Sequence, residues 1–408
     1  MNIFEYGAVG DGVTNDTQAI QKAINDANVG ETFVFPTGYT FKVANLILKS
    51  DINYVLEGNC RLLGSDKYED YQQLTTEEAY SGEPMYTIIA AYHGQNITIS
   101  GSGTIDGNGL SFVNSQTKYI YKLEKYPRIT QLFFENVTNL RITDITIENG
   151  CYWTIHPVGC QQVLFSRLKI NQDLMMPNCD GIDPDHCQDV IISDCFITSA
   201  DDCIVLKNTK YYKDYGPTKN ITVNNCILKS TSAGFKIGTE SFGDFSNITF
   251  SNSIIHDSNR GISIQVRDGG NVSDLVCSNL IIKTRKFNDI WWGKGEPIAI
   301  TSYPRTPGLS SLSKISNVLF SNISMEGENC LYFSALESNL ISNIKISNSF
   351  FKLTPSTRYP NQQYDNRPFG AEHSGLFDGA LVPVFINNVD NIDTEGLSIS
   401  FDDTNNQS

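Results

Sequence analysis

A short phrase recurs along most of the chain and constrains the fold more than any other feature. It consists of an Asn or similar polar residue, a few alternating apolar residues, a Ser or Asn, and a second apolar run. Copies begin at Asn96, Asn139, Gln162, Asp189, Asn220, Asn247, Asn317 and Asn343. Successive copies commonly start about 22 to 31 residues apart. Two short strands joined by a polar bend cannot bury their apolar face alone, so the copies must stack on one another.

Other repeat classes fit this pattern poorly. Leucine-rich repeats need a Leu-rich phrase of tighter period, and helical repeats need a 3.6-residue period that these segments lack. Stacking therefore predicts a solenoid of parallel strands, with very little helix after residue 28. No linker-like segment interrupts the sequence, so we expect one domain. This domain should span residues 1–408. Within it we expect the cap and first rungs at 1–65, the main coil at 95–400, and the catalytic rungs at about 150–270.

One segment, residues 16–27, has a helical pattern. Its apolar stripe consists of Ala19, Ile20, Ala23 and Ile24. Asp16 is the expected N-cap. A helix at this end would cover the open end of the coil, as terminal repeats require.

The acidic balance limits the possible partners. The formal net charge is −15, whereas nucleic acids and anionic membranes require a basic face, so neither is expected as a partner. No stretch approaches the roughly 20 apolar residues of a membrane span. The opening also lacks the basic and apolar segments of a signal peptide. We expect a cytoplasmic protein if Met1 is the native start, and a secreted or periplasmic one if a signal was removed; the oligomeric state stays open.

Cysteine usage indicates buried thiols. None of the ten cysteines forms a Cys-x-x-Cys pair, which disfavours zinc. Most lie inside apolar strand-like runs, as Cys195 and Cys226 do. We therefore expect small buried hydrophobic side chains and not a disulfide framework, and neither a metal nor a cofactor is expected.

Three aspartates are the main candidates for catalytic residues. Asp180 lies in Asn-Cys-Asp-Gly, and Asp201 and Asp202 follow 21 and 22 residues later. That spacing is close to one rung, and adjacent rungs lie about 4.8 Å apart, so we expect the carboxylates on one face. Clustered carboxylates repel, and at least one should hold a proton near neutral pH. A protonated acid beside a carboxylate that activates water suits glycoside hydrolysis.

Two other interpretations of these residues are available. Aspartates commonly end loops and cap turns, an interpretation that suits Asp183 and Asp185, on either side of Pro184. A calcium site could also use many carboxylates, but the spacing does not match the twelve-residue loop with its terminal Glu.

Motifs along nearly the whole chain resemble those of one enzyme family. They are Phe4-Glu-Tyr-Gly-Ala-Val-Gly-Asp-Gly, Gly101-Ser-Gly-Thr-Ile-Asp-Gly, Trp153-Thr-Ile-His156-Pro, Asn178-Cys-Asp180-Gly and Asp201-Asp202. The chain resembles glycoside hydrolase family 28, the polygalacturonases and rhamnogalacturonan hydrolases of the pectin lyase-like superfamily. The resemblance implies an all-β fold, a single right-handed parallel β-helix with a short N-terminal capping helix. It also implies that Asp201 is the general acid, and that Asp180 and Asp202 position and deprotonate a water, with inversion.

Two polygalacturonase motifs are missing. Ala233 stands where Gly-His-Gly has its His, and Ser263 and Gln265 stand where Arg-x-Lys grips the galacturonate carboxylate. The chain thus has the expected acid and base but lacks the residues that usually bind the galacturonate carboxylate. We therefore expect a rhamnogalacturonan-type, exo-acting or oligosaccharide substrate in preference to plain homogalacturonan.

Several further side chains are candidates for binding the substrate. They are Asn178, His156, Lys207, Lys236, Glu240 and Arg267. Lys236 and Glu240 lie one rung beyond Asp202, and Lys207 could hold the acid pair ionised. A purely structural role remains open for His156, Lys207 and Lys236. The pair Trp291-Trp292 could stack on sugar rings or pack against the coil.

These features together predict a glycoside hydrolase that cleaves a pectin-related polysaccharide or oligosaccharide. Two alternatives remain. A polysaccharide lyase on the same coil would use calcium and an Arg or Lys base. A non-catalytic glycan-binding β-helix would have no need of three stacked carboxylates.

Overall fold

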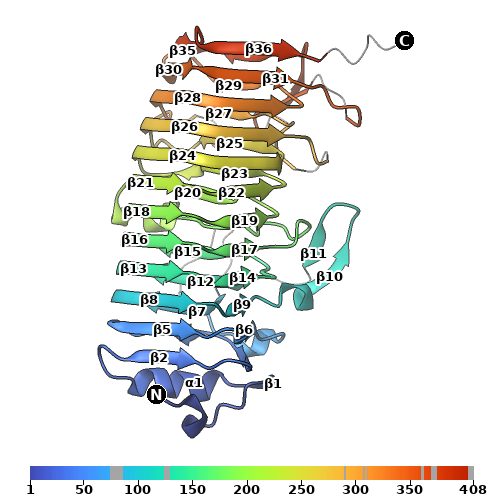
Figure 1. Cartoon of the computed structure of the whole chain (residues 1–408). Coiled ribbons are helices and arrows are strands. Elements are labelled where there is room, and N and C mark those ends of the chain that lie inside the picture. Colours follow the sequence, from blue (N-terminus) through green and yellow to red (C-terminus); the bar gives the residue numbers. More distant parts are fainter. Residues whose placement is uncertain are drawn as a thin grey trace. The chain divides into compact units, whose positions relative to one another are not determined.

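The computed structural model describes residues 1–73, 86–123, 129–288, 291–306, 308–309, 311–359, 363–368 and 375–402. The chain divides into two compact units, residues 1–200 and 201–408, and each is described by itself. In Figure 1 the first unit runs from blue to green and the second from green through yellow to red. The expectation of a single domain over the whole chain stays a prediction.

In the first unit, most strands stack in two parallel series. One series consists of β2 (Thr32–Phe35), β5 (Ile52–Leu56), β8 (Gln95–Gly101), β13 (Thr138–Thr143), β16 (Gln161–Ser166) and β18 (Gln188–Ser193). The other consists of β1 (Asp11–Asn15), β3 (Thr40–Val43), β6 (Arg61–Gly64), β9 (Thr104–Asp106), β14 (Thr146–Glu148), β17 (Lys169–Asn171) and β19 (Phe196–Ser199).

A further parallel sheet completes the rungs of this unit. Its strands are β4 (Leu46–Ile47), β7 (Tyr86–Tyr92), β12 (Ile129–Glu135) and β15 (Ile155–Val158). Between β9 and β12 the chain forms an antiparallel hairpin, with strands β10 (Val113–Gln116) and β11 (Tyr121–Leu123). Short 3-10 turns lie at Ile3–Tyr6, Tyr68–Asp70 and Gly109–Phe112.

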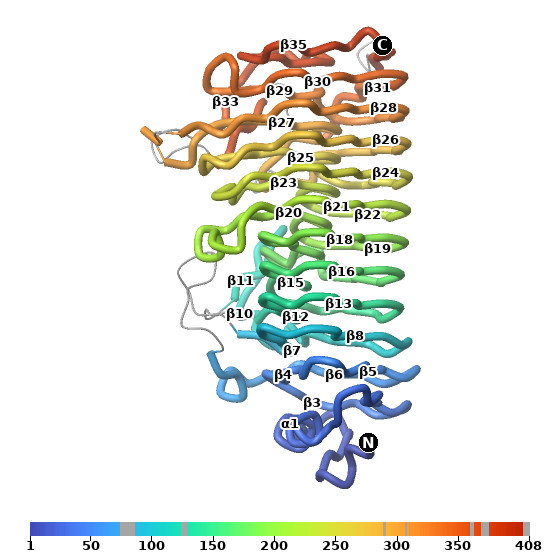
Figure 2. Tube along the Cα trace, turned by 90° about the vertical axis from the view of Figure 1, so that its left-hand side faces the viewer, coloured from blue at the N-terminus to red at the C-terminus, as the bar shows by residue number. Residues whose placement is uncertain are grey.

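The second unit repeats this plan with longer strands. One parallel sheet consists of β21 (Thr218–Asn224), β22 (Ile227–Ser230), β24 (Phe245–Ser258), β26 (Val272–Thr284), β28 (Ile315–Gly327), β30 (Ile341–Ser347), β31 (Ser349–Leu353), β35 (Val389–Asp393) and β36 (Leu397–Phe401). The other consists of β20 (Ile204–Asn208), β23 (Ala233–Ser241), β25 (Arg260–Val266), β27 (Ile298–Ser302), β29 (Leu331–Ala335) and β34 (Val384–Asn387). Figure 2 shows the successive rungs of this unit from the side.

Two smaller features of the second unit lie outside the stacked sheets. Lys210–Tyr215 is a 3-10 turn. The antiparallel strands β32 (Gln363–Asp365) and β33 (Leu376–Asp378) form a hairpin.

The recurring Asn has a conformational reason. Asn139, Asn220 and Asn247 all adopt the left-handed region, with φ of 58°, 59° and 56°. Asn tolerates this region better than most residues because its short side chain bonds locally. The side chains also bond from rung to rung, as in Asn247 Nδ2 to Asn220 Oδ1 at 2.9 Å. The polar position of the phrase therefore turns the backbone at each rung and helps to fix the stacking register.

The interior is built from columns of aligned apolar side chains. In the second unit, Phe235 pairs with Ile262, and Ile262 with Ile298 on the next strand. All three are fully buried. The ten cysteines are buried free thiols, which agrees with their expected role as small apolar side chains. The expected all-β class, a right-handed parallel β-helix, is confirmed.

The capping helix forms, but its N-terminus differs from expectation. The helix α1 covers Thr17–Asp26, and Ile20, Ala23 and Ile24 are buried. Asp16 occupies the N-cap position without capping the helix through its side chain. Its carboxylate instead accepts bonds from the N–H groups of Val9 and Gly10, at 2.7 and 3.0 Å. These two N–H groups belong to a loop outside the helix, which a local capping rule does not consider.

Helix is otherwise scarce. In the described parts of the chain α1 is the single α-helix, and the remaining helical segments are 3-10 turns. No helix among those residues is long and apolar enough to cross a membrane.

Candidate active site

Asp201 and Asp202 lie in the bend that leads into β20. The N–H of Asp202 donates to Asp201 Oδ1 at 3.0 Å. Asp201 is half-buried, whereas Asp202 is 1% exposed. The bend thus gives two adjacent and chemically identical side chains different environments.

Both oxygens of Asp202 accept hydrogen bonds. Oδ1 accepts from the Ser232 hydroxyl at 2.7 Å and from the Ala233 N–H at 3.1 Å. Oδ2 accepts from Lys236 Nζ, also at 2.7 Å. Charge-assisted bonds of this length suit an ionised carboxylate.

Asp201 has the opposite character. Burial and the neighbouring negative charge of Asp202 raise the pKa of Asp201 to about 6, against the opposing influence of Lys236 and Lys207. A carboxyl group with such a pKa keeps its proton in mildly acidic solution. The pair therefore offers one proton donor and one hydrogen-bonded carboxylate, which are the two groups that glycoside hydrolysis requires.

Asp180 lies in the first unit, in a segment that continues the rung of β15. The Thr154 N–H donates to the Asp180 carbonyl at 3.0 Å, and Ile182 bridges to Ile155 in parallel register. Asp180 is 2% exposed. Asn178 precedes it in the left-handed region, with φ of 53°. That Asp180 acts together with Asp201 and Asp202 stays a prediction from their one-rung spacing.

His156 is held within the first unit. Its Nε2 lies 3.2 Å from Asp185 Oδ2, and both side chains are buried. Trp153 contacts the imidazole edge-on, with ring centroids 4.7 Å apart. Asp183 and Asp185 are fully buried and Asp185 bridges to Val158, so they lie within a rung and not at an exposed turn. His156 is thus held by a buried aspartate and an aromatic ring of its own unit.

The glycosyl hydrolases family 28 model matches residues 26–290, which is more than half of the sequence. The chain belongs to glycosyl hydrolase family 28. A probable polygalacturonase of Vitis vinifera is 29% identical over 264 residues, which cover 59% of this chain and 52% of that protein. Polygalacturonase-2 of Solanum lycopersicum is 30% identical over 211 residues, covering 50% and 43%. The chain spans about half the length of the curated relatives it matches.

Solved structures support the fold. A family 28 exopolygalacturonase of Yersinia enterocolitica superposes with a TM-score of 0.77 at 19% identity. The match covers 97% of this chain and 78% of that one. A hyperthermoactive exopolygalacturonase of Thermotoga maritima has a TM-score of 0.65 at 21% identity, with 87% of each chain covered.

In place of the Arg-x-Lys motif, the second unit carries two buried and uncharged side chains. Ser263 and Gln265, in the Arg-x-Lys places, are 0% and 1% exposed. Gln265 Nε2 donates to the carbonyl of Arg367, a residue of the segment that follows β32. We call residues 363–368 and 375–378 the arm. The arm thus contacts β25 at Gln265, one of these two positions.

Several contacts hold the arm on the sheet. Arg260 Nη2 donates to the Asp365 carbonyl at 3.0 Å, and the Tyr332 hydroxyl to Asn366 Oδ1 at 2.8 Å. Tyr364 stacks on Tyr332 with centroids 5.6 Å apart. Burial alone would raise the pKa of Asp365, but its bonds with Arg367 and the charge of Arg260 hold that pKa below its usual value. The arm is thus anchored by charge as well as by packing.

Lys207 has more than one acidic neighbour. Its charge opposes the rise in the pKa of Asp201, and its Nζ pairs with Glu240 Oε2 at 3.5 Å. Arg305, which sequence reasoning missed, lies 3.6 Å from the other oxygen of Glu240. Arg305 follows β27 in a segment outside the repeated phrase, so no sequence signal marked it. In the second unit, Arg305 is thus a second cation beside Glu240, and the sequence did not predict it.

Two glycines of β23 allow the close approach of neighbouring side chains and backbone. Gly238 has a φ of 92°, and a Cβ there would lie 2.1 Å from the Gln265 carbonyl oxygen. A Cβ at Gly234 would lie 2.7 Å from Ile255. Both positions therefore require glycine, because neighbouring rungs fill the space that a Cβ would occupy.

The remaining candidates, Arg267 and the two tryptophans, are fully or partly buried. Arg267 is 1% exposed, and its guanidinium donates to Thr301 Oγ1 at 2.9 Å and to the Asn366 carbonyl at 3.3 Å. Burial lowers the pKa of Arg267 to about 9. Arg267 thus supports the arm. Trp291 and Trp292 are half-buried, and their backbone carbonyls accept bonds from Arg367 and Asn259.

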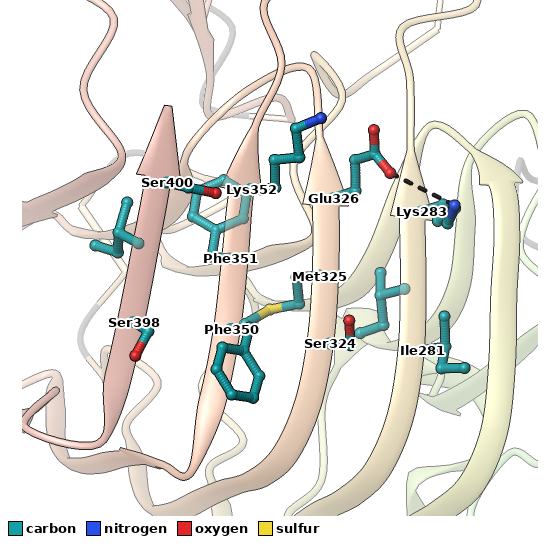
Figure 3. Close-up of a pocket in the computed structure, with 12 residues that line it drawn as sticks. Ile281, Lys283, Ser324, Met325, Glu326, Phe350, Phe351, Lys352, Ser398 and Ser400 are labelled. Atoms are coloured by element: carbon teal, nitrogen blue, oxygen red, sulfur yellow. Dashed lines mark ion pairs between the residues drawn. The ribbon is translucent and has the colours of Figure 1, made fainter. Parts of the chain in front are cut away.

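A shallow hollow lies on the outer face of the long strands of the second unit (Figure 3). Lys283 and Glu326 form an ion pair of 3.5 Å there, beside the exposed Phe350 and Ile281. These strands belong to the other sheet from the one that carries Lys236. The hollow has no acid pair.

Proposed function

We propose that this protein is a glycoside hydrolase that cleaves a pectin-related glycan with inversion at the anomeric carbon. One observation carries the proposal: adjacent Asp201 and Asp202 differ in environment, and burial raises the pKa of Asp201 while Lys236 binds Asp202. Enzymes of this class need one carboxylic acid and one carboxylate. Membership of family 28 supports the same assignment.

In the proposed mechanism, Asp201 donates its proton to the glycosidic oxygen as the bond to the anomeric carbon breaks. Asp180 and Asp202 orient a water on the opposite face of the sugar and take its proton. The water oxygen forms the new bond to the anomeric carbon. Lys236 stabilises the carboxylate of Asp202 through their 2.7 Å bond.

We further propose that the enzyme acts at a chain end. The arm contacts Gln265 on β25, so we expect the substrate to lie over β20 and β23, next to the acid pair. A polymer could not continue across β25 beneath the arm. Release of short products from one end would follow.

The substrate is proposed to be rhamnogalacturonan-type or otherwise decorated, and not plain homogalacturonan. A galacturonate beside the scissile bond needs a charged partner, and Ala233, Ser263 and Gln265 supply none. The relative named probable endo-xylogalacturonan hydrolase A of Aspergillus niger is 27% identical over 240 residues, and its name indicates a decorated substrate.

The test compares kcat/KM for polygalacturonate and for rhamnogalacturonan fragments, with Asp201→Asn as the inactive reference. Reducing ends should appear without the absorbance of unsaturated uronides, and the products should be short from the first minutes. NMR of the fresh product gives its anomeric configuration. A clear preference for polygalacturonate would overturn the substrate assignment, and unsaturated products would identify a lyase.

A further inference from the structure

The hollow on the outer face of the second unit contains an exposed aromatic side chain (Figure 3). Its volume is about 340 Å³, at the lower end of the range for small-ligand pockets. Phe350 of β31 is 62% exposed there, although phenylalanine is usually buried. In parallel register, the outward side chains across β26, β28, β31 and β36 are Ile281, Ser324, Phe350 and Ser398. The small Ser324 thus leaves a gap between the larger Ile281 and Phe350.

A second row of outward side chains on the same strands supplies charge. In register, this row consists of Lys283, Glu326, Lys352 and Ser400. Lys283 pairs with Glu326 at 3.5 Å, and Lys352 pairs with Asp402 at 2.6 Å. The paired side chains are all at least 39% exposed, and ion pairs at such positions are weak. Because a lysine ammonium has three donors, each lysine can keep its acid and still donate to a ligand.

The lining of the hollow has the chemistry of a sugar-binding surface. Exposed apolar surface that is rimmed by polar groups marks interaction sites. Phe350 offers a flat apolar ring, and the hydroxyl-bearing Ser324 and Ser398 lie on the strands to either side of it. The lining also carries two lysines and one glutamate, an excess of positive charge on a chain whose formal net charge is −15. This charge favours an anionic glycan.

A second copy of the chain fits this face less well. A contact between two copies through the same face would be isologous, so it would bring the lysines of one copy near those of the other. The two chains would also repel each other, because each has a formal net charge of −15. Ser324 and Ser398 interrupt the apolar row, whereas the core of a protein interface is largely apolar.

We propose that this hollow is a second, non-catalytic binding site for a uronate-bearing glycan. A sugar ring stacks on Phe350, its hydroxyls bond to Ser324 and Ser398, and its carboxylate accepts from Lys352 or Lys283. The site belongs to the other sheet from the one that carries Lys236. It would hold the protein on uronate-rich parts of a polymer while the acid pair acts elsewhere. This use of the site rests on the proposed function, but the binding itself does not.

The test of the aromatic contact is the binding of polygalacturonate to the full chain, measured by retardation in native gels that contain the polymer. Every protein carries Asp201→Asn, so that the polymer is not cut. Phe350→Ser should weaken the apparent affinity roughly fivefold or more, because the stacked ring is lost. Phe196→Ser is the matched control: Phe196 is 55% exposed and lies outside the hollow, so its loss should leave the affinity unchanged.

The charge contact has its own matched pair of variants. Lys352 and Lys345 are both exposed and paired with an aspartate, at 2.6 and 2.8 Å, but Lys345 lies outside the hollow. Lys352→Met should weaken the binding of polygalacturonate roughly threefold or more, since a charge-assisted bond is lost. The binding of a neutral galactan should not change. Lys345→Met removes the same charge and should affect neither ligand.

Equal affinities of the folded Phe350→Ser and Phe196→Ser proteins would overturn the inference. If Phe350→Ser does not fold, the comparison of Lys352→Met with Lys345→Met decides, and equal affinities there would overturn it too. A wild-type dimer that Phe350→Ser dissociates in sedimentation would show that this face binds a second copy instead. Because binding does not require turnover, a protein inactive on every pectic glycan would refute the proposed function and leave this measurement intact.

Discussion

Lys236 Nζ lies 2.7 Å from Asp202 Oδ2, although the two residues are 34 positions apart in the sequence. The contact joins the strand β23 to the bend before β20, so the stacking of rungs creates it. Lys236 binds one aspartate of the adjacent pair, and burial favours the neutral form of the other. The difference between acid and base thus depends on a neighbouring rung.

The first prediction concerns the acid pair. Asp201→Asn and Asp202→Asn should each lower kcat by roughly 10²–10⁴, the range usual for general acid–base groups, without loss of the fold. Initial rates of reducing-end release and circular dichroism measure the two effects. Asp393→Asn breaks an exposed 2.8 Å ion pair with Lys345 and serves as the control that should keep full activity. Near-normal rates in both active-site variants would remove the assignment.

The second prediction concerns pH. As the general acid, Asp201 must be protonated, and its pKa is raised to about 6 by burial and by Asp202. kcat/KM should therefore fall as pH rises above about 6. Lys236 opposes this shift, so Lys236→Met should move the alkaline limb to higher pH. A profile that rises steadily from pH 5 to pH 8 would contradict the role of Asp201.

The third prediction concerns stability. Between the usual pKa of 3.8 and the raised value of about 6, the unfolded chain loses the Asp201 proton while the folded chain keeps it. The contribution of Asp201 to stability is therefore present below pH 3.8 and is lost as pH rises through about 6. Asp201→Asn imitates the neutral acid, so its Tm should exceed that of the wild type at pH 7 more than at pH 4. An equal difference in Tm at both pH values would show that burial does not destabilise the ionised form of Asp201.

The fourth prediction concerns the arm. Asp365→Ala removes the carboxylate that binds Arg367, at 2.8 Å, and the N–H of Gly293. Because Arg367 then loses its buried carboxylate partner and Arg260 loses a neighbouring negative charge, the variant should lose about 3–5 kcal/mol of unfolding free energy. A loosened arm should also permit internal cleavage, seen as a faster fall in polymer viscosity for each bond cut. Asp378→Ala, at an exposed position of the same arm, is the matched control.

Part of this protein could be predicted from sequence because the signal is local and repeated. The Asn phrase predicts stacked strands since each copy carries its own apolar alternation and its own left-handed turn, as Asn139 and Asn247 do. The capping helix follows from the spacing of Ile20, Ala23 and Ile24. The Asp201-Asp202 pair was evident because few structural roles require adjacent aspartates in that context.

Other features depended on tertiary contacts that no local pattern encodes. The arm reaches Gln265 from Arg367, 102 residues away, through a backbone carbonyl that any residue would supply. Asp16 bonds to the loop at Val9 and Gly10 instead of its own helix, and Arg305 meets Glu240 from a segment without repeats. The sequence by itself determined the rungs and the acid pair, because periodic alternation and adjacent charges act over a few residues. Only the folded structure decided which charges meet and which face stays open, because the stacked rungs bring together side chains that are far apart in the chain.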